Sequence, residues 1–456
     1  MGYLSEFRWL SKFGPVFGVH GKNVQIIHEP SEFYQTLNTL ALKAEKRITL
    51  SALYLGTDDL EVKFVQNLRR ALTNKPDKLQ LTVLLDYARG SRGGDCSSRT
   101  MLVPLIANFG AQRVRVSLFH SPRLRGFVRW LLPQKWNEII GLQHIKVYVF
   151  DNDILLSGAN LSDQYFKQRQ DRYVLFRDAP ELANYYSQLV DTIGGLSLQL
   201  DASNHLAVDD RHGVHPYLTP LDKFIETAQI MLKRFVEPNK LPEDDVPFDT
   251  HVYPLIQMGQ LELGNDHLVT RKVLESCPGS SRISLATGYF NLVPEYENII
   301  ARSFASFDVI TAHPRANSFY KAPGIMQYIP VLYTNLLKKF YKKTESVRNR
   351  IRLWEYDRHG WTFHAKGLWY YPPGEVKPVL SMIGSPNFGY RSIYRDLESQ
   401  VVIVTEDDEL RGRLDQEQEL VLTKTSLPVS ASTFDDPERV IPFWIILITS
   451  FVRNFF

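Results

Sequence analysis

Two similar segments constrain the fold of this chain more than any other feature of its sequence. Arg47–Tyr54 reads RITLSALY, and Arg282–Tyr289 reads RISLATGY. Both are rich in Ile, Leu, Thr and Tyr, which predicts a β-strand in each case. A helical pattern precedes each segment, at Ser31–Ala44 in the first case and His267–Ser276 in the second. A second predicted strand follows each segment, at Leu79–Leu85 and at Phe307–Thr311. A repeat of this extent predicts two homologous halves.

The alternation of strands and helices predicts the fold class. We expect an α/β protein whose two halves are built on mixed, mostly parallel sheets flanked by helices. The length of 456 residues also exceeds that of one ordinary domain. The expected division is an N-terminal half at 1–200, a linker region at 201–250, a C-terminal half at 251–430 and an apolar tail at 431–456. The linker region should hold one amphipathic helix, Leu221–Phe235.

Each half also contains a His-x-Lys segment, His144–Lys146 in the first and His364–Lys366 in the second. Alternate residues of a strand project from the same face, so the His and Lys of each segment should point together. A turn of small residues follows each segment and ends in Asn, at Asn160 and at Asn387. Eleven residues after each Asn stands an acid, Asp171 in the first half and Glu398 in the second. A single His-x-Lys is a weak signal, whereas the duplicated order of His, Lys, turn, Asn and acid is specific.

These residue types, brought together, suit chemistry at a phosphoryl group. One imidazole can attack phosphorus while the other protonates the leaving group. The lysine and asparagine side chains would neutralise charge on the non-bridging oxygens. A carboxylate behind each ring would fix its tautomer and orientation. This chemistry requires no cofactor, and no acidic cluster in the sequence suggests a metal site.

The first motif, His144-Ile-Lys146 with Asp151 and then Ser-Gly-Ala-Asn160, resembles the HxKxxxxD and GxN motif of the phospholipase D superfamily. The segment from His364 to Gly-Ser-Pro-Asn387 resembles its second copy. Within this superfamily the chain is most similar to the eukaryotic mitochondrial phosphatidylglycerophosphate synthases. The stretches that carry this resemblance are Asp86–Arg92, Ser157–Phe166, Arg169–Tyr173, Ala316–Tyr320, Phe363–Trp369 and Ile383–Ser392.

The second motif departs from the superfamily pattern in two ways. Tyr371 stands where the pattern has Asp, and seven more residues separate His364 from Asn387 than separate His144 from Asn160. The missing acid makes a direct catalytic role for the first-motif Asp151 doubtful, although we include Asp151 in the expected site.

The resemblance implies one active site, shared by the two halves at a pseudo-twofold interface. It implies phosphatidyl transfer from CDP-diacylglycerol to glycerol-3-phosphate, with release of CMP, on the route to phosphatidylglycerol and cardiolipin. His144 would form a phosphatidyl-histidine, while His364 would protonate CMP and then deprotonate the acceptor. Ser385, in the second turn, would contact substrate. The resemblance further implies peripheral association with the matrix face of the mitochondrial inner membrane, although no transit peptide is evident.

Three alternatives stay open at this point: a phosphatidylserine synthase-like transferase, a nuclease, and an inactive membrane-binding scaffold that keeps the fold. The charge balance of 53 basic against 50 acidic residues disfavours the nuclease, which needs a broad basic face. We therefore expect no nucleic-acid partner. The sequence leaves a homo-oligomer open.

Basic loops are the expected site for the phosphate of the acceptor. A dianionic acceptor should be held by cations beyond the two lysines. The candidates are Arg89, Arg92 and Arg99 in the first half, and Arg315 and Lys321 in the second. These loops follow strands, and α/β sites form at the carboxyl ends of strands. Arg89 and Arg315 are preferred because their positions match in the two halves.

Three stretches could dock an anionic membrane surface: 123–136, 328–352 and 440–452. The first two mix aromatic residues with cations, and the third is an uncharged apolar run containing Trp444. An amphipathic core helix explains each stretch as well. None is an uninterrupted apolar run of the length that a membrane-spanning helix needs.

Overall fold

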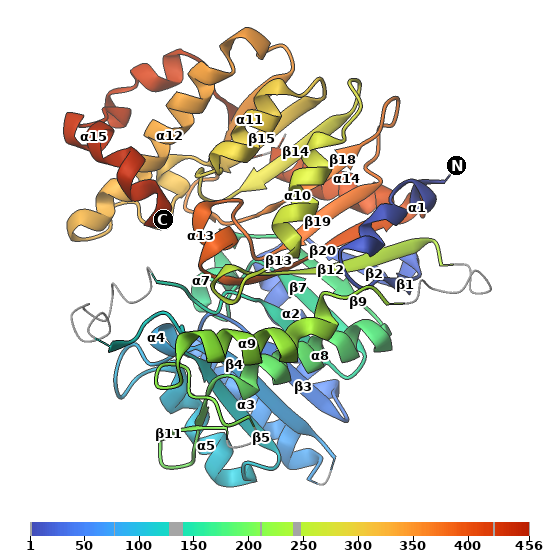
Figure 1. Cartoon of the computed structure of the whole chain (residues 1–456), viewed down its shortest axis with the longest axis vertical. Helices are drawn as coiled ribbons and strands as arrows, with labels where there is room; N and C mark the ends of the chain where they lie inside the picture. Colours follow the sequence, from blue (N-terminus) through green and yellow to red (C-terminus); the bar gives the residue numbers. More distant parts are fainter. Residues whose placement is uncertain are drawn as a thin grey trace.

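The computed structural model describes residues 2–76, 78–126, 140–209, 212–239, 248–422 and 425–455. Figure 1 shows two α/β halves, with the N-terminal half (blue to green) below the C-terminal half (yellow to red). Each half is built on its own large sheet, as the sequence repeat predicts.

The sheet of the N-terminal half has nine strands within the described residues. Their order is β11 (Leu206–Val208), β10 (Leu198–Leu200), β5 (Val114–Phe119), β4 (Gln80–Asp86), β3 (Arg47–Ser51), β6 (Val147–Phe150), β7 (Asp153–Ser157), β9 (Tyr173–Phe176) and β2 (Val24–Ile27). Every residue of β6 is buried, because both faces of the sheet are covered. β6 begins directly after Lys146, so the first His-x-Lys segment lies at the end of a central strand.

The sheet of the C-terminal half, counted over the same residues, has ten strands. Nine follow the order β1 (Phe17–Val19), β12 (Thr250–Met258), β20 (Leu397–Thr405), β19 (Leu380–Gly384), β18 (Gly367–Tyr371), β14 (Arg282–Thr287), β15 (Ser306–Ala312), β16 (Ile351–Tyr356) and β21 (Ser426–Pro428), and β13 (Leu263–Gly264) pairs with β12. Here β18 begins directly after Lys366. The two halves thus present their His-x-Lys segments in the same way.

The strand pairing corrects one part of the predicted fold class. Within the described residues, parallel pairing in each large sheet is confined to three strands, β3, β4 and β5 in one and β14, β15 and β16 in the other. All other neighbouring strands of these sheets are antiparallel, so the sheets are mixed but not mostly parallel. The strand after each His-x-Lys segment forms a hairpin with the next, and connections this short join antiparallel strands.

Helices cover both faces of each sheet and create three regions of core. The outer faces carry α2 (Pro30–Lys43), α3 (Asp59–Asn74) and α5 (Ser98–Phe109) on one sheet, and α10 (Asn265–Glu275), α11 (Pro294–Arg302) and α12 (Ile329–Lys343) on the other. Between the sheets lie α8 (Pro180–Gly195), α9 (Leu221–Leu232) and α14 (Asp408–Leu422), whose apolar side chains join both sheets in one core. This shared core holds the halves together and fixes the cleft between them.

Short helical elements complete the described chain. They are α1 (Tyr3–Glu6), α4 (Tyr87–Gly90), α7 (Asp163–Lys167), α13 (Tyr390–Tyr394), α15 (Phe443–Val452), η1 (Arg8–Lys12), η2 (Gly21–Asn23), η4 (Lys233–Phe235), η5 (Gly259–Leu261), η6 (Pro314–Ala316), η7 (Gly324–Tyr328), η8 (Glu345–Val347), η9 (Ser432–Asp435), η10 (Pro437–Arg439) and η11 (Arg453–Phe455). No helix of the described residues has the length and apolar character needed to cross a bilayer.

The predicted division at residue 200 does not follow the sheets. β1 pairs with β12, and Phe7, Leu10 and Val16 pack in the core of the C-terminal half. At the other boundary, β11 belongs to the N-terminal sheet although it lies in the predicted linker region. The expected linker helix is present as α9 and η4. Residues 127–136 of the basic-aromatic stretch 123–136, and residues 240–247 of the acidic, proline-rich stretch 237–247, lie outside the described residues.

Candidate active site

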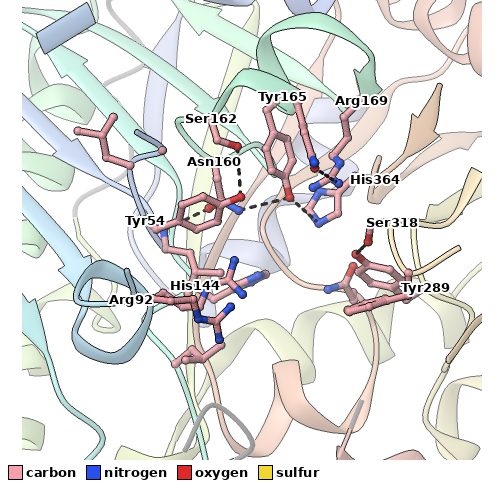
Figure 2. Close-up of a pocket in the computed structure, with 18 of the residues that line it drawn as sticks. Tyr54, Arg92, His144, Asn160, Ser162, Tyr165, Arg169, Tyr289, Ser318 and His364 are labelled. Atoms are coloured by element: carbon pink, nitrogen blue, oxygen red, sulfur yellow. Dashed lines mark hydrogen bonds between the residues drawn. The ribbon is translucent and has the colours of Figure 1, made fainter. Parts of the chain in front are cut away.

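A cavity of about 580 Å³ lies between the two halves and contains both motif histidines. Its lining comes from both halves, so the expectation of one shared site agrees with the geometry. Figure 2 shows Tyr54, Asn160 and Ser162 along one side of this cavity and Tyr289 and Ser318 along another. His144 and His364 both face the space between them.

The backbone docks each His-x-Lys segment onto the opposite half. His144 donates its backbone N–H to Leu397 (2.8 Å), and Leu397 donates its own to Leu142 (2.8 Å). In the mirrored arrangement, β17 (Thr362–Phe363) pairs in parallel with β8 (Arg169–Gln170), and the N–H of His364 donates to Gln170 (2.8 Å). Each histidine therefore lies beside the segment that carries the other half's acid: Glu398 belongs to β20, and Asp171 directly follows β8.

This docking crosses the histidine–carboxylate pairs between the halves. Nδ1 of His144 lies 2.9 Å from Oε2 of Glu398, and Nδ1 of His364 lies 2.6 Å from Oδ2 of Asp171. Both carboxylates are buried behind the rings and do not line the cavity. They hold Nδ1 on each ring and leave the opposite nitrogen, Nε2, for chemistry.

The two imidazoles differ at Nε2. Nε2 of His364 lies 3.2 Å from the hydroxyl of Tyr165 and 3.1 Å from Nζ of Lys366, whereas Nε2 of His144 has no hydrogen-bond partner among the described residues. The His144 side chain is also the more accessible, at 12% exposed against 5% for His364. Burial, followed by the nearby lysine, lowers the pKa of both imidazoles well below the usual value. This shift favours the neutral imidazole, the form that a nucleophile or a base requires, so His364 must take up a proton with the anionic substrate before it can act as an acid.

The two lysines are buried beside the histidines. Nζ of Lys146 donates to the carbonyl of His144 (2.8 Å), and Nζ of Lys366 donates to the carbonyl of His364 (2.7 Å). Burial lowers the pKa of Lys366 to about 8 and the pKa of Lys146 in the same direction. Burial raises the pKa of Glu398, and raises that of Asp171 to about 6. The site concentrates cations that an anionic phosphoryl group would stabilise.

The small-residue turns have steric and hydrogen-bonding roles. A Cβ on Gly158 would lie 2.7 Å from Oδ1 of Asp171 and 2.8 Å from Cδ of Lys366, so a larger residue would displace the crossed pair. The matching residue in the second half is Ser385, whose hydroxyl donates to Glu398. Ser385 does not line the cavity. It holds the carboxylate in place, which corrects its expected role in substrate binding.

Both motif asparagines line the cavity. Oδ1 of Asn160 accepts the N–H of Leu53 (3.2 Å), and its amide group donates to Tyr165 (3.3 Å). Oδ1 of Asn387 is buried and has no partner among the described residues.

Two of the five predicted basic-loop residues line the cavity, Arg89 and Arg92. Asp86 caps α4 by accepting the N–H of Arg89 (2.9 Å), and its other oxygen accepts the N–H of Gln143 (3.1 Å). Asp86 therefore ties this loop to the first His-x-Lys segment. The guanidinium of Arg89 also lies 4.6 Å from the ring centre of Tyr54.

The other three basic residues and Asp151 are not brought to the cavity. Arg99 binds Asn204, Arg315 reaches Asp357 (3.5 Å), and Lys321 lies in a separate hollow beside η7. Asp151 lies at the far end of β6 from His144, where its carboxylate accepts the backbone N–H groups of 45, 46 and 47. Its expected place among the catalytic residues is therefore wrong, because it joins the β6–β7 turn to the start of β3.

Several lining residues were not predicted from the sequence. Tyr54 and Tyr289 end the two repeated segments and could have been found from that symmetry. Arg169 and Arg391 also line the cavity, and each contacts a partner five residues away in sequence, Gln164 and Asp396 respectively. Relative to the motif asparagines, these two pairs occupy the same positions with donor and acceptor exchanged. No local pattern signals this exchange.

Among the described residues, no group of three or more His, Cys, Asp or Glu side chains could hold a metal ion.

Comparison with known proteins gives a consistent result. No protein-family profile matches the chain. The mitochondrial CDP-diacylglycerol–glycerol-3-phosphate 3-phosphatidyltransferase of Homo sapiens is 41% identical, and the match covers 99% of this chain and 86% of the relative. The enzyme of the same name from Saccharomyces cerevisiae is 36% identical, with 95% and 88% covered. Among solved structures, phosphatidylserine synthase of Haemophilus influenzae matches with a TM-score of 0.76 at 19% identity over both full chains, a likeness of fold.

Proposed function

The chain belongs to the family of the CDP-diacylglycerol–glycerol-3-phosphate 3-phosphatidyltransferases, and we propose that it acts through a phosphatidyl-histidine on His144. The reaction transfers a phosphatidyl group from CDP-diacylglycerol to glycerol-3-phosphate. The products are CMP and phosphatidylglycerophosphate, a precursor in phospholipid biosynthesis.

In the first proposed step, Nε2 of His144 forms a bond to the phosphorus that carries diacylglycerol. The bond between that phosphorus and the CMP oxygen breaks, and His364 gives a proton to CMP. In the second step, His364 takes the proton from the primary hydroxyl of glycerol-3-phosphate, and this oxygen displaces Nε2. Lys146, Lys366 and the motif asparagines would stabilise charge on the non-bridging oxygens.

The observation that supports His144 as nucleophile is the difference between the two Nε2 atoms. Nε2 of His144 lacks a partner within the described chain, while that of His364 is engaged by Tyr165 (3.2 Å) and by Nζ of Lys366 (3.1 Å). A nucleophile needs an unengaged lone pair, whereas an acid–base group benefits from a partner that holds its proton in place.

Isotope exchange tests the two steps separately. Without acceptor, labelled CMP should exchange into CDP-diacylglycerol, and label in the phosphatidyl phosphate should become attached to His144. His144→Ala should abolish exchange and transfer, whereas His364→Ala should still accumulate the labelled protein slowly. Covalent label on His364 would reverse the assignment. Full transfer activity without CMP exchange would overturn the covalent route altogether.

Arg89 and Arg92 are the cations we propose for the phosphate of the acceptor. Both line the cavity; Arg89 belongs to α4, and Arg92 follows this helix by two residues. Loss of one charge-assisted phosphate contact costs about 2–3 kcal/mol, which is about a 30- to 150-fold loss in kcat/KM for glycerol-3-phosphate. Arg315→Ala is a matched control, because Arg315 follows the equivalent strand but points to Asp357.

This assignment is tested by comparing acceptors. Arg89→Ala should weaken glycerol-3-phosphate use and leave CMP exchange intact, while Arg315→Ala should change neither. Serine and water should be poor acceptors in both variants and in the wild type. If Arg89→Ala instead weakens CDP-diacylglycerol binding, this loop binds the pyrophosphate and our acceptor site is misplaced.

We also propose that the protein associates peripherally with the matrix face of the mitochondrial inner membrane. Relatives from mammals are named mitochondrial, and CDP-diacylglycerol is a membrane lipid. Release from isolated mitoplast membranes by alkaline carbonate would support this location, and retention would indicate a spanning anchor.

A further inference from the structure

The two sides of the active-site cavity differ in chemistry. The side formed by the N-terminal half carries three arginines, Arg89, Arg92 and Arg169, beside the rings of Tyr54 and Tyr165. The side formed by the C-terminal half carries three aromatic rings: Tyr289 stacks on Tyr333 with ring centres 5.5 Å apart, and Phe319 lies 6.2 Å from Tyr289. We call Tyr289, Phe319 and Tyr333 the aromatic wall. Arg391 and Asn291 lie in the lining beside it.

The aromatic wall continues outward to the C-terminal helix. Tyr333 belongs to α12, and α12 is tied to α15 because Asn335 donates to Thr449 (2.9 Å). Tyr328, at the end of η7, packs edge-on against Trp444 of α15 (4.9 Å between ring centres). The cavity residue Asn291 donates to the carbonyl of Arg453 (2.6 Å), just beyond α15. Figure 1 places α15 beside α12 on the outer side of the C-terminal half. The helix is thus fixed at the rim of the cavity.

α15 exposes apolar side chains instead of burying them. Residues 440–452 contain no charged residue, and in the described part of α15 Ile445 and Thr449 are buried against the protein. The exposed large side chains of this region are Val440, Phe443, Trp444, Ile446, Leu447 and Ile448, together with Ile325 and Met326 of η7. We call these eight residues the apolar rim. Contiguous exposed apolar surface of this kind marks a binding surface.

We propose that the apolar rim enters the interface of an anionic bilayer and that the diacylglycerol part of CDP-diacylglycerol reaches the histidines along the aromatic wall. The proposal rests on the transferase activity, because that activity requires a diacyl lipid to enter the cavity. The rings of Trp444 and Tyr328 pack together beside the apolar rim, and such aromatic residues are enriched at membrane–water interfaces. Lys321, next to η7, is exposed and can contact anionic headgroups. The acceptor then enters from the opposite, arginine-lined side, so that water-soluble and lipid substrates do not share a path.

The test compares two double variants of similar apolar loss. Phe443→Ser with Leu447→Ser removes rim side chains that are 73% and 63% exposed. Phe304→Ser with Val376→Ser is the control, because these side chains are 75% and 78% exposed but precede β15 and follow β18, at the strand ends remote from the histidines. Vesicles of phosphatidylcholine with about one fifth phosphatidylserine supply an anionic surface that contains neither substrate nor product.

The rim variant should lose at least about tenfold in vesicle partitioning, and the control should lose little. When long-chain CDP-diacylglycerol is added to such vesicles, the transfer activity of the rim variant should fall in parallel. Activity on a short-chain, monomerically dissolved CDP-diacylglycerol should be unchanged, which separates failure of docking from failure of the catalytic steps.

Equal vesicle binding by the two double variants would overturn the proposal. So would a lipid-free wild-type dimer that the rim substitutions convert to a monomer in sedimentation, because a second copy would then cover the rim. Phe319→Ala tests the internal path: KM should rise for long-chain CDP-diacylglycerol but not for glycerol-3-phosphate. A rise confined to the acceptor would place the lipid on the arginine-lined side instead.

Discussion

The crossed histidine–carboxylate pairs give the sharpest prediction about mechanism. Glu398→Gln and Asp171→Asn should impair different steps, because each acid serves the histidine of the opposite half. Glu398→Gln acts on the proposed nucleophile, so formation of the covalent intermediate should slow. Asp171→Asn acts on the proposed base. CMP is a weakly basic leaving group that needs little protonation, whereas a primary hydroxyl must lose its proton, so the second step should suffer more.

The structure sets the range of the Glu398→Gln effect. Oε1 of Glu398 accepts from Ser392 (2.9 Å), and Oε2 accepts from Ser385 and faces His144. If the amide oxygen of Gln faces the ring, a charge-assisted bond is weakened at a cost of about 1.5–3 kcal/mol, or about 10- to 150-fold in rate. If the amide nitrogen faces the ring, His144 takes the wrong tautomer and the loss approaches about 10⁴-fold.

Rapid-quench kinetics with phosphatidyl-labelled substrate separates the two variants. Asp171→Asn should accumulate labelled protein in a burst and then stall, whereas Glu398→Gln should release CMP slowly without accumulating label. Circular dichroism should show that both variants keep the fold of the wild type. The reasoning is refuted if label accumulates in Glu398→Gln instead, or if both variants slow CMP release equally with no covalent species.

Three further predictions concern stability, pH and metals. Asp151→Asn should leave kcat unchanged but lower the free energy of unfolding by about 1–3 kcal/mol, because the backbone N–H groups of residues 45–47 lose a charged acceptor. A large loss of kcat in a folded variant would show that Asp151 takes part in catalysis. The pKa of Lys366, about 8, predicts that kcat/KM falls as the pH rises through this value, since the protonated ammonium is the form that binds phosphate. In Lys366→Arg the fall in kcat/KM should occur at a higher pH. If the fall stays at the same pH, another group is responsible for it. Activity should persist in excess chelator, and a loss restored only by Mg²⁺ would refute metal-free transfer.

Much of the site could be predicted because the duplicated order of residues is visible in the sequence. The repeat placed His144 and His364 on equivalent strands, and the equal spacing from Asn to acid identified Asp171 and Glu398. The crossing of these pairs could not be predicted. It depends on Leu397 docking beside His144, a register between segments more than 250 residues apart that no local pattern encodes.

The loop arginines show where symmetry fails as a guide. Arg89 and Arg315 follow equivalent strands, and the N–H of each is capped in the same way, by Asp86 and by His313. Their side chains diverge because Asp357 attracts the second one away from the cavity. Backbone position follows from the repeat, whereas the direction of a long, exposed side chain depends on the charges that the tertiary structure places around it.

A pocket assembled from two homologous halves can work in one direction when the surroundings of its two histidines differ. The position five residues after each motif asparagine is Tyr165 in one half and Ser392 in the other. Tyr165 reaches across to Nε2 of His364, but Ser392 is too short to do the same and donates to Glu398 instead (2.9 Å). This aligned pair, together with Lys366, therefore engages the reactive nitrogen of His364 and leaves that of His144 unengaged. The arginine pairs of Arg169 and Arg391 and the aromatic wall of the C-terminal half extend the same asymmetry outward. The duplication supplies paired acid–base and cationic groups, and its divergence supports a fixed order of use.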